Sequence, residues 1–194
     1  MLSDDYKGND IAFFDDISNW RPFQIELFNK LFQDPPGSIP IEEQQLKPAD
    51  PRKIIHLLDT VGNTGKSMFF KYLTVRTNVS IGRLTYGSAS QLRSSAVNLG
   101  PRKLYIVDLT HSKGDLEKQE DLLAVLEDIK SGLLIRTIYG DDRMLVMEPP
   151  HILIANNTLL NYEALSEDRW ELYKIHNPKG KGPYTLKSFN PKRL

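Results

Sequence analysis

A glycine-punctuated turn contains the residues of this chain that are best suited to bind phosphate, Gly62-Asn63-Thr64-Gly65-Lys66-Ser67. An apolar run, Ile54–Leu58, precedes the turn, and a helix-compatible stretch, MFFKYLTV, follows it. Successive backbone N–H groups in such a turn form a concave anion site, which the dipole of the following helix reinforces. Lys66 would reach the β- and γ-phosphate oxygens, and the Ser67 hydroxyl would ligate Mg²⁺. The sequence therefore predicts a binding site for ATP with Mg²⁺.

One position departs from the usual phosphate-loop pattern, G-x-x-x-x-G-K-[ST]. Thr60 stands where the first glycine is expected, and Gly62 follows two residues later. A chance glycine-rich turn is the alternative interpretation. The strand before the turn and the helix-compatible stretch after it favour the phosphate loop.

Two later apolar runs end in polar residues that could complete such a site. LYIVDL ends with Asp108 close to its carboxyl end, where a doubly wound sheet presents residues to a ligand. We predict that Asp108 is a Walker B acid that holds Mg²⁺ through water, although an Asp at a strand end is otherwise a turn former or helix cap. HILIANN ends in Asn156 and Asn157, whose amides could orient the attacking water or contact the γ-phosphate.

The remaining pattern predicts the elements that position these residues. Trp20, Phe23, Leu27 and Leu31 recur at helical spacing, and a helix from about residue 116 to 131 ends at Gly132. LLIRTIY and MLVME flank a turn sequence, which predicts a β-hairpin, and SEDRWELYKI is interpreted as partly helical. The alternation of strands and helices predicts an α/β fold, with a mainly parallel sheet, flanking helices, a hairpin insertion and a small helical N-terminal element.

We divide the chain into three parts. Residues 1–50 are an N-terminal leader with a helical oligomerisation element, residues 51–176 are the phosphate-loop domain, and residues 177–194 are a basic C-terminal tail.

Composition excludes several classes of protein. The chain has 194 residues, 40% of them hydrophobic, with 25 basic and 25 acidic side chains, so it is not a uniformly basic nucleic-acid coat. Without cysteine it has no disulfide framework and no thiolate nucleophile. The four histidines, at 56, 111, 151 and 176, are scattered and give little support to a metal site. No apolar run approaches the length of a membrane span, and the acidic start lacks the layout of a signal peptide.

Several segments, in order, carry a resemblance to a known family: RPFQ at 21–24, PRKIIHLLDTVGNTGKS, YIVDL, SGLLIRTIYGDDRMLV, PPHILIANN and LSEDRWELYKI. Together, over about residues 20–176, they resemble the superfamily 3 helicase domain of the replication initiator (Rep) proteins of circular Rep-encoding single-stranded DNA viruses. The nanovirus and alphasatellite type is nearest. RPFQ resembles a family RPWQ signature, with Phe23 where tryptophan is usual.

The resemblance implies a P-loop NTPase of AAA+-like, superfamily 3 type. It would form a ring, expected to be a hexamer, that translocates on single-stranded DNA and unwinds with 3′ to 5′ polarity. Lys66 and Ser67 match motif A, Asp108 matches motif B, and Asn156 matches the sensor asparagine of motif C. Many members have two adjacent acids in motif B, whereas Leu109 follows Asp108 here, so the general base stays open.

Arg169, in SEDRW, matches the position of the family's arginine finger. Such a finger would enter the ATP site of the neighbouring subunit and neutralise charge on the transferring phosphoryl group. The alternative is a helix-surface salt bridge with Glu167 or Asp168.

The expected hairpin between residues 135 and 146 resembles the motif B′ region, whose tips line the pore and grip DNA in this family. Arg136, Tyr139 and Arg143 are the candidate DNA contacts, because a cation pairs with phosphate and an aromatic ring stacks on any base. Asp141 and Asp142 would repel phosphate, so a solvated turn is the alternative.

The family's N-terminal nicking endonuclease, with its His-hydrophobic-His pair and catalytic tyrosine, has no counterpart before the phosphate loop. We therefore expect a helicase motor without its nickase domain. The expected partners are single-stranded DNA, further copies of the chain and that nickase domain, in a soluble protein of the host cell nucleus. A noncatalytic nucleotide-dependent assembly module is the first alternative, and a small-molecule P-loop kinase is the second.

Overall fold

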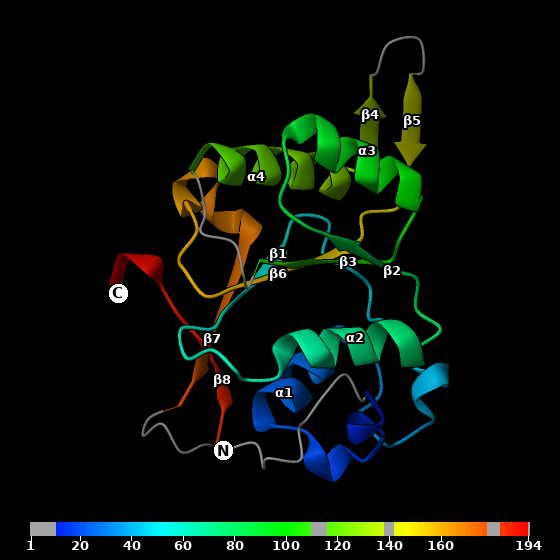
Figure 1. Ribbon diagram of the computed structural model, residues 1–194, viewed down its shortest axis with the longest axis vertical. Coiled ribbons are helices and arrows are strands. Elements are labelled where there is room, and N and C mark those ends of the chain that lie inside the picture. Colours follow the sequence, from blue (N-terminus) through cyan, green and yellow to red (C-terminus); the bar gives the residue numbers. More distant parts are fainter. Residues whose placement is uncertain (1–10, 110–115, 138–141, 178–182, 194) are drawn as a thin grey trace.

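A mostly parallel sheet lies between two layers of helices in the computed structural model, which describes residues 11–109, 116–137, 142–177 and 183–193 (Figure 1). Within these residues six strands form the sheet, in the order β2-β3-β6-β1-β7-β8. The first five run parallel, and β8 pairs with β7 antiparallel. The strands are β1 (Ile54–Leu58), β2 (Ile81–Leu84), β3 (Leu104–Asp108), β6 (His151–Asn156), β7 (Trp170–His176) and β8 (Thr185–Ser188). The α/β prediction with a mainly parallel sheet is confirmed.

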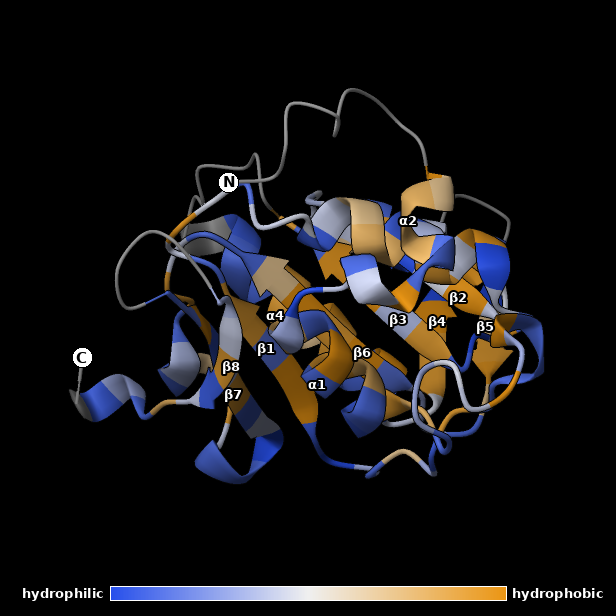
Figure 2. Ribbon diagram, turned by 90° about the horizontal axis from the view of Figure 1, so that it is seen from below, coloured by the Kyte–Doolittle hydropathy of each residue, from blue (hydrophilic) through white to orange (hydrophobic). Residues whose placement is uncertain are grey.

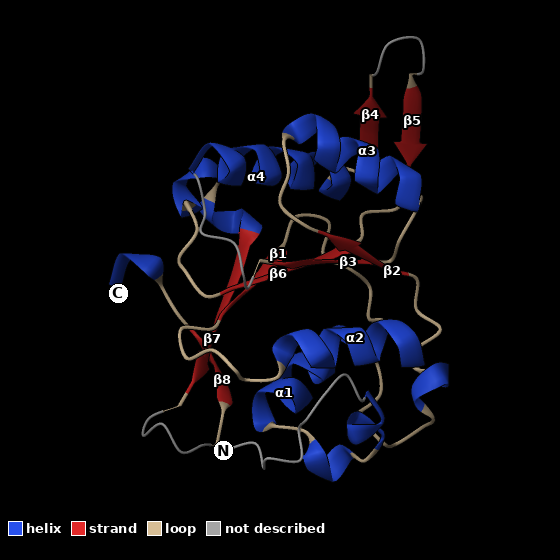
Figure 3. Ribbon diagram, in the orientation of Figure 1, coloured by secondary structure: helices blue, strands red, loops and turns tan. Residues whose placement is uncertain are grey.

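The α-helices cover both faces of the sheet (Figures 1 and 3). α1 (Pro22–Leu31) and α2 (Lys66–Arg76) cover one face, and α3 (Ala89–Leu99) and α4 (Leu116–Lys130) cover the other. Right-handed crossovers place helices on opposite faces when the strand order advances in opposite directions. The chain therefore leaves β1 toward one face and β3 toward the other, and open α/β sheets with such a reversal bind ligands at the carboxyl ends of the strands. The short 3-10 helices are Ile11–Asp15, Ile17–Asn19, Ile41–Glu43, Tyr162–Ala164, Glu167–Arg169 and Pro191–Arg193.

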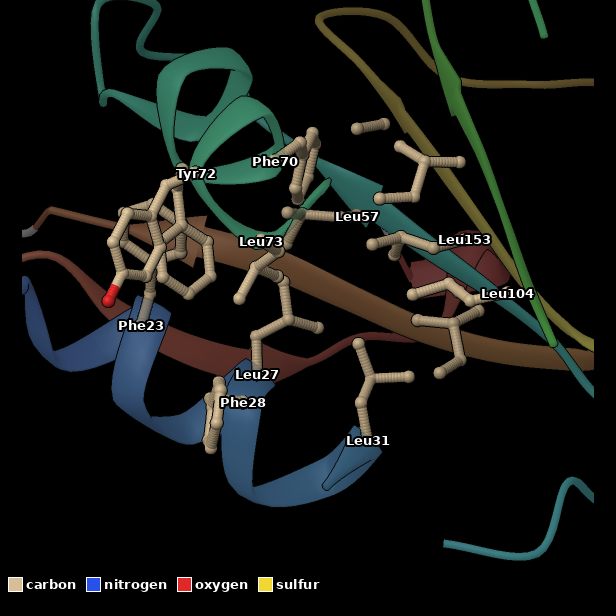
Figure 4. Close-up of a cluster of buried hydrophobic side chains, with 14 of the residues drawn as sticks. Phe23, Leu27, Phe28, Leu31, Leu57, Phe70, Tyr72, Leu73, Leu104 and Leu153 are labelled. Carbon is tan, nitrogen blue, oxygen red and sulfur yellow. The ribbon is translucent and has the colours of Figure 1, made fainter. Parts of the chain in front are cut away.

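The core under α1 and α2 consists of large apolar side chains from helices and strands (Figure 4). From α1, Phe23, Leu27 and Leu31 are fully buried and face Leu73 of α2 and Leu153 of β6. The apolar face of α1 is thus packed inside its own chain. Burying side chains of this size stabilises the fold by about 1.5–3 kcal/mol each.

The described part of the leader docks on this same layer. Phe14 is only 1% exposed, and its ring lies 5.8 Å from Phe69 and 5.6 Å from Tyr72, measured between ring centroids. Asp15 forms an ion pair with Arg76 at the end of α2, with 2.6 Å between Oδ2 and Nη2. Residues 11–19 therefore form part of the helical layer.

A β-hairpin stands apart from the main sheet, as predicted, and projects beyond α3 (Figure 1). It consists of β4 (Leu133–Arg136) and β5 (Arg143–Val146). Gly132 joins α4 to β4 with φ +78°, and a Cβ there would lie 2.3 Å from the carbonyl oxygen of Met147. Only glycine fits such a close approach in the left-handed region, so Gly132 both ends α4 and starts the hairpin.

The helical interpretation of SEDRWELYKI was wrong for most of that segment. A single 3-10 turn, Glu167–Arg169, leads into β7, which pairs with β1 on one side and with β8 on the other. Trp170 and Ile175 are buried at 8% and 0% exposure, so pairing and burial in the sheet outweigh the local helical preference. β8 lies within residues 177–194, so part of the basic tail belongs to the sheet.

Hydropathy follows these layers. Apolar colour is concentrated on the central strands and on the inner surfaces of the helices (Figure 2). In the ranges that the structure describes, no helix combines the length and the apolar character needed to cross a membrane.

Candidate phosphate-binding site

The loop between β1 and α2 has the backbone of an anion site. Gly62, Asn63 and Gly65 all have positive φ, at 74°, 50° and 82°. Gly65 is the N-cap residue of α2, and a Cβ added to it would come no closer than 3.6 Å to another atom, the Nε2 of Gln24. Glycine is therefore favoured at position 65 by its backbone angles and not by crowding. Left-handed residues in succession turn backbone N–H groups toward the inside of the loop.

A carboxylate of the chain itself occupies the inside of this loop. Asp59, the first residue after β1, is 0% exposed. Its Oδ1 accepts hydrogen bonds from the backbone N–H groups of Val61 and Gly62, at 3.1 and 3.0 Å. Its Oδ2 accepts from the Thr64 hydroxyl at 2.7 Å and from Lys66 Nζ at 2.8 Å. The loop is thus already folded around an anion.

The ion pair between Asp59 and Lys66 is shielded from solvent, with side chains 0% and 3% exposed. Burial alone raises the pKa of Asp59, but the hydrogen bonds from Lys66 and Thr64 outweigh it and hold that pKa below its usual value. Asp59 is therefore ionised at neutral pH and strongly bound to its donors.

The two asparagines at the end of β6, Asn156 within the strand and Asn157 after it, lie on opposite faces of the sheet. Lys66 Nζ donates to Asn157 Oδ1 at 2.9 Å, so Asn157 belongs to the phosphate-loop face. Asn156, the predicted sensor, is 2% exposed, and its Oδ1 lies 2.7 Å from His56 Nε2. Adjacent strand residues point to opposite faces, so only one of the two amides can contact Lys66. Asn157 is the amide that contacts Lys66.

Asn156 instead joins a buried network that supports the loop from the other face. His56 Nδ1 lies 2.9 Å from the Tyr162 hydroxyl. The backbone carbonyl of Asn156 accepts a hydrogen bond from the backbone N–H of Asp59 at 2.8 Å. Burial lowers the pKa of His56 to about 4, although the hydrogen bond to Asn156 opposes the shift. His56 is therefore neutral at pH 7 and links Tyr162 to the start of the loop.

Asp108 lies where the sequence predicted, at the carboxyl end of β3. It shares the α2 face of that strand with Leu104 and Ile106, and its side chain is 10% exposed. Arg83 Nη2 is 3.3 Å from its Oδ2. In the described residues no group of three or more His, Cys, Asp or Glu side chains could hold a metal ion. Mg²⁺ held by Ser67 and Asp108 would therefore need phosphate and water oxygens to complete its coordination.

Arg169 lies at the opposite edge of the sheet from the phosphate loop. It immediately precedes β7, whose Trp170 pairs with Ile54 at the start of β1, whereas the loop follows the end of β1. A strand of five residues spans roughly 16 Å. The Nε of Arg169 lies 3.4 Å from Glu127 of α4, and not against either neighbouring acid that the sequence suggested. Arg169 therefore does not approach Lys66 of its own chain.

The hairpin residues predicted to grip DNA differ in exposure. Arg136 is 8% exposed, and its Nη1 donates to Asn98 of α3 at 3.2 Å. Arg143, opposite it in the β4–β5 register, is exposed. Tyr139 lies outside the described residues. Arg136 thus holds the hairpin to α3, and Arg143 faces solvent.

One face of the hairpin is apolar and open to solvent. Its four side chains form two directly opposed cross-strand pairs and are 45–65% exposed: Leu133 with Val146, and Ile135 with Met144. On the other face Leu134 packs in the core at 0% exposure. The body of the protein therefore buries only one face of the hairpin.

Sequence reasoning missed one residue of the site, Asp59, and left the choice between Asn156 and Asn157 open. Asp59 directly follows an apolar strand and Asp108 ends one, so the rule that identified Asp108 would also have found Asp59 if applied to β1. The choice of Asn157 over Asn156 required the exact end of β6, which fixes the face on which each amide lies.

No protein-family model matches the chain. The chain is similar to Para-Rep C6 of Subterranean clover stunt C6 alphasatellite, with 26% identity over 159 residues. The match covers 79% of this chain and 47% of that relative, so the chain spans about half the length of the curated relative that it matches. This similarity supports the prediction of a Rep-related viral protein.

Proposed function

We propose that this chain is the ATPase motor of a Rep-related viral replication protein, which hydrolyses ATP with Mg²⁺ and couples hydrolysis to movement on single-stranded DNA. One observation carries the proposal. Lys66, the first residue of α2, and the backbone N–H groups of Val61 and Gly62 converge on the Asp59 carboxylate, just after the carboxyl end of β1. Asp59 stands in for a phosphate oxygen there, so the donor set fits the triphosphate of a nucleotide.

The side chains near this loop would have different roles in binding the nucleotide and in hydrolysis. Lys66 and the loop amides would bind the β- and γ-phosphates, and Ser67 and Asp108 would hold Mg²⁺, which would neutralise phosphate charge when bound. Of the two amides that the sequence offered, we assign to Asn157 the sensor role that the resemblance gave to Asn156, because Asn157 is the amide in contact with Lys66. It would contact the γ-phosphate or orient the attacking water.

The position of Arg169 supports a proposal of assembly. An arginine at the amino edge of the sheet serves catalysis only if it enters the ATP site of another copy. We therefore propose an oligomeric ring, in which Arg169 exchanges Glu127 for the phosphoryl group of a neighbour's ATP. The projecting hairpin would contact the DNA backbone, with Arg143 as its described exposed cation.

The test is phosphate release with and without single-stranded DNA, alongside the solution mass with ATP. We expect release that DNA stimulates, that Lys66→Ala abolishes, and that accompanies a larger assembly. Binding and assembly without release would indicate the noncatalytic module. Phosphate transfer to a small molecule would indicate the kinase. Unchanged release in Lys66→Ala would contradict the proposal.

A further inference from the structure

We propose that Asp59 is a built-in competitor for the phosphate cradle, so that nucleotide binds only after Lys66 and the loop amides have left this carboxylate. The inference rests on the proposed function, because it concerns regulation of the same site. It begins from the four donors around Asp59, which are Val61, Gly62, Thr64 and Lys66.

The carboxylate and a phosphate oxygen require the same donors. Two backbone N–H groups and the Lys66 ammonium are the groups that a phosphate loop offers to its ligand. Here they surround Asp59 at 2.8–3.1 Å, in a site where the pair is at most 3% exposed. A phosphate entering this space would meet a fixed negative charge at close range with little water to screen it. Binding therefore requires the ion pair to open.

Asp59 is poorly suited to the other role open to a buried acid, that of general base. An ionised carboxylate offers about four lone-pair sites, and Asp59 already uses four. The same donors keep its pKa below the usual value, whereas an effective base has a pKa near the working pH. The geometry therefore favours Asp59 as a competitor for the phosphate donors, which we call the gate, over Asp59 as a general base.

The expected effect follows from a population argument. When the open state is a small fraction of the molecules, the apparent dissociation constant is the intrinsic constant divided by that fraction. Asp59→Asn keeps an oxygen for Val61 and Gly62 but removes the charge that holds Lys66. Hydrogen bonds to charged groups are about twice as strong as neutral ones, so the open fraction should rise roughly 10- to 100-fold.

The experiment measures calorimetric affinity for AMP-PNP, a nonhydrolysable ATP analogue, with and without Mg²⁺. We expect Asp59→Asn to bind roughly 10- to 100-fold more tightly than wild type in both conditions. The control is Asp15→Asn, which removes the same charge from an exposed pair with Arg76 and should bind like wild type. Asp59→Ser is the second variant, because its hydroxyl still accepts from the loop amides if the Asn variant does not fold.

The outcomes separate the two proposals. Tighter binding in either Asp59 variant supports the gate. Equal or weaker binding in a folded variant, while wild type binds, overturns the gate and leaves the proposed function intact. No binding by wild type or by any variant overturns the proposed function. Carboxyl ¹³C NMR of the wild type needs no substitution, and an unchanged Asp59 resonance with AMP-PNP bound would also overturn the gate.

Discussion

The buried pair of Asp59 and Lys66 predicts a strong energetic coupling that can be measured without any ligand. We consider Asp59→Asn, Lys66→Met and the double variant. Each single change leaves one buried charge without its partner, which costs about 3–5 kcal/mol in such pairs. Lys66→Met should lie at the low end, because Asp59 keeps three donors, whereas Asp59→Asn leaves the buried Lys66 with Asn157.

The double variant has no buried charge at this site and should cost much less than the sum of the single variants. We expect a coupling free energy of about 2–3 kcal/mol. The single variants should lower Tm by roughly 6–20 °C, since 1 kcal/mol shifts Tm by about 2–4 °C in a chain of this size. Urea unfolding followed by circular dichroism, with equal m-values across the cycle, gives the free energies.

A matched cycle on Arg52 and Asp168 provides the control, because that ion pair is about half exposed, at 54% and 53%. Its coupling should be much smaller than that of the buried pair, because solvent screens the two exposed charges. If the single changes at Asp59 and Lys66 add to within about 0.5 kcal/mol, the two charges do not depend on each other. The description of the loop as folded around an internal anion would then be refuted.

Three further predictions concern the network and the site. Burial holds the pKa of His56 at about 4, so the unfolded chain takes up the proton first, and stability should fall by about 2 kcal/mol between pH 7 and pH 5. His56→Gln should lack this loss and His176→Gln should keep it, as urea unfolding at the two pH values will show. Asn157→Ala should slow ATP turnover about 100-fold with little loss of stability. Asn156→Ala should lower the unfolding free energy by about 1–3 kcal/mol, because it removes the acceptor of a buried histidine, and the reverse pattern would contradict the assignment. Arg169→Ala should still bind ATP but turn it over about 10³ to 10⁵ times more slowly, and wild-type turnover in the assembled variant would exclude the finger role.

The parts of the fold that the sequence predicted well have strong local signals. The apolar runs of β1 and β3 are buried on both faces, and Gly132 is required by its backbone angles and by the nearby Met147 carbonyl. These properties depend on a few neighbouring residues.

The parts that were missed depend on distant partners. β7 is a strand because β1 and β8 lie on its two sides, and local sequence does not show this. α3 is an exception, because its start has a local signal. Although the helix is rich in serine, Ser88 and Gln91 form a capping box there that a search for this motif would have found. Asp59 and Asn157 both accept from Lys66 only because the ends of β1 and β6 are neighbours in the sheet.

Lys66 and Arg169 are separated by the full length of β1, so in the proposed motor each molecule would carry two unlike halves of a reaction centre, one at each edge of the sheet. Copies that pair head to tail close into a circle if the rotation allows, and otherwise extend as a filament. A mixture of two inactive variants, Lys66→Ala and Arg169→Ala, would then regain activity wherever the intact half of one molecule meets the intact half of the other. An excess of either variant over wild type would inhibit ATP hydrolysis by the mixed assembly.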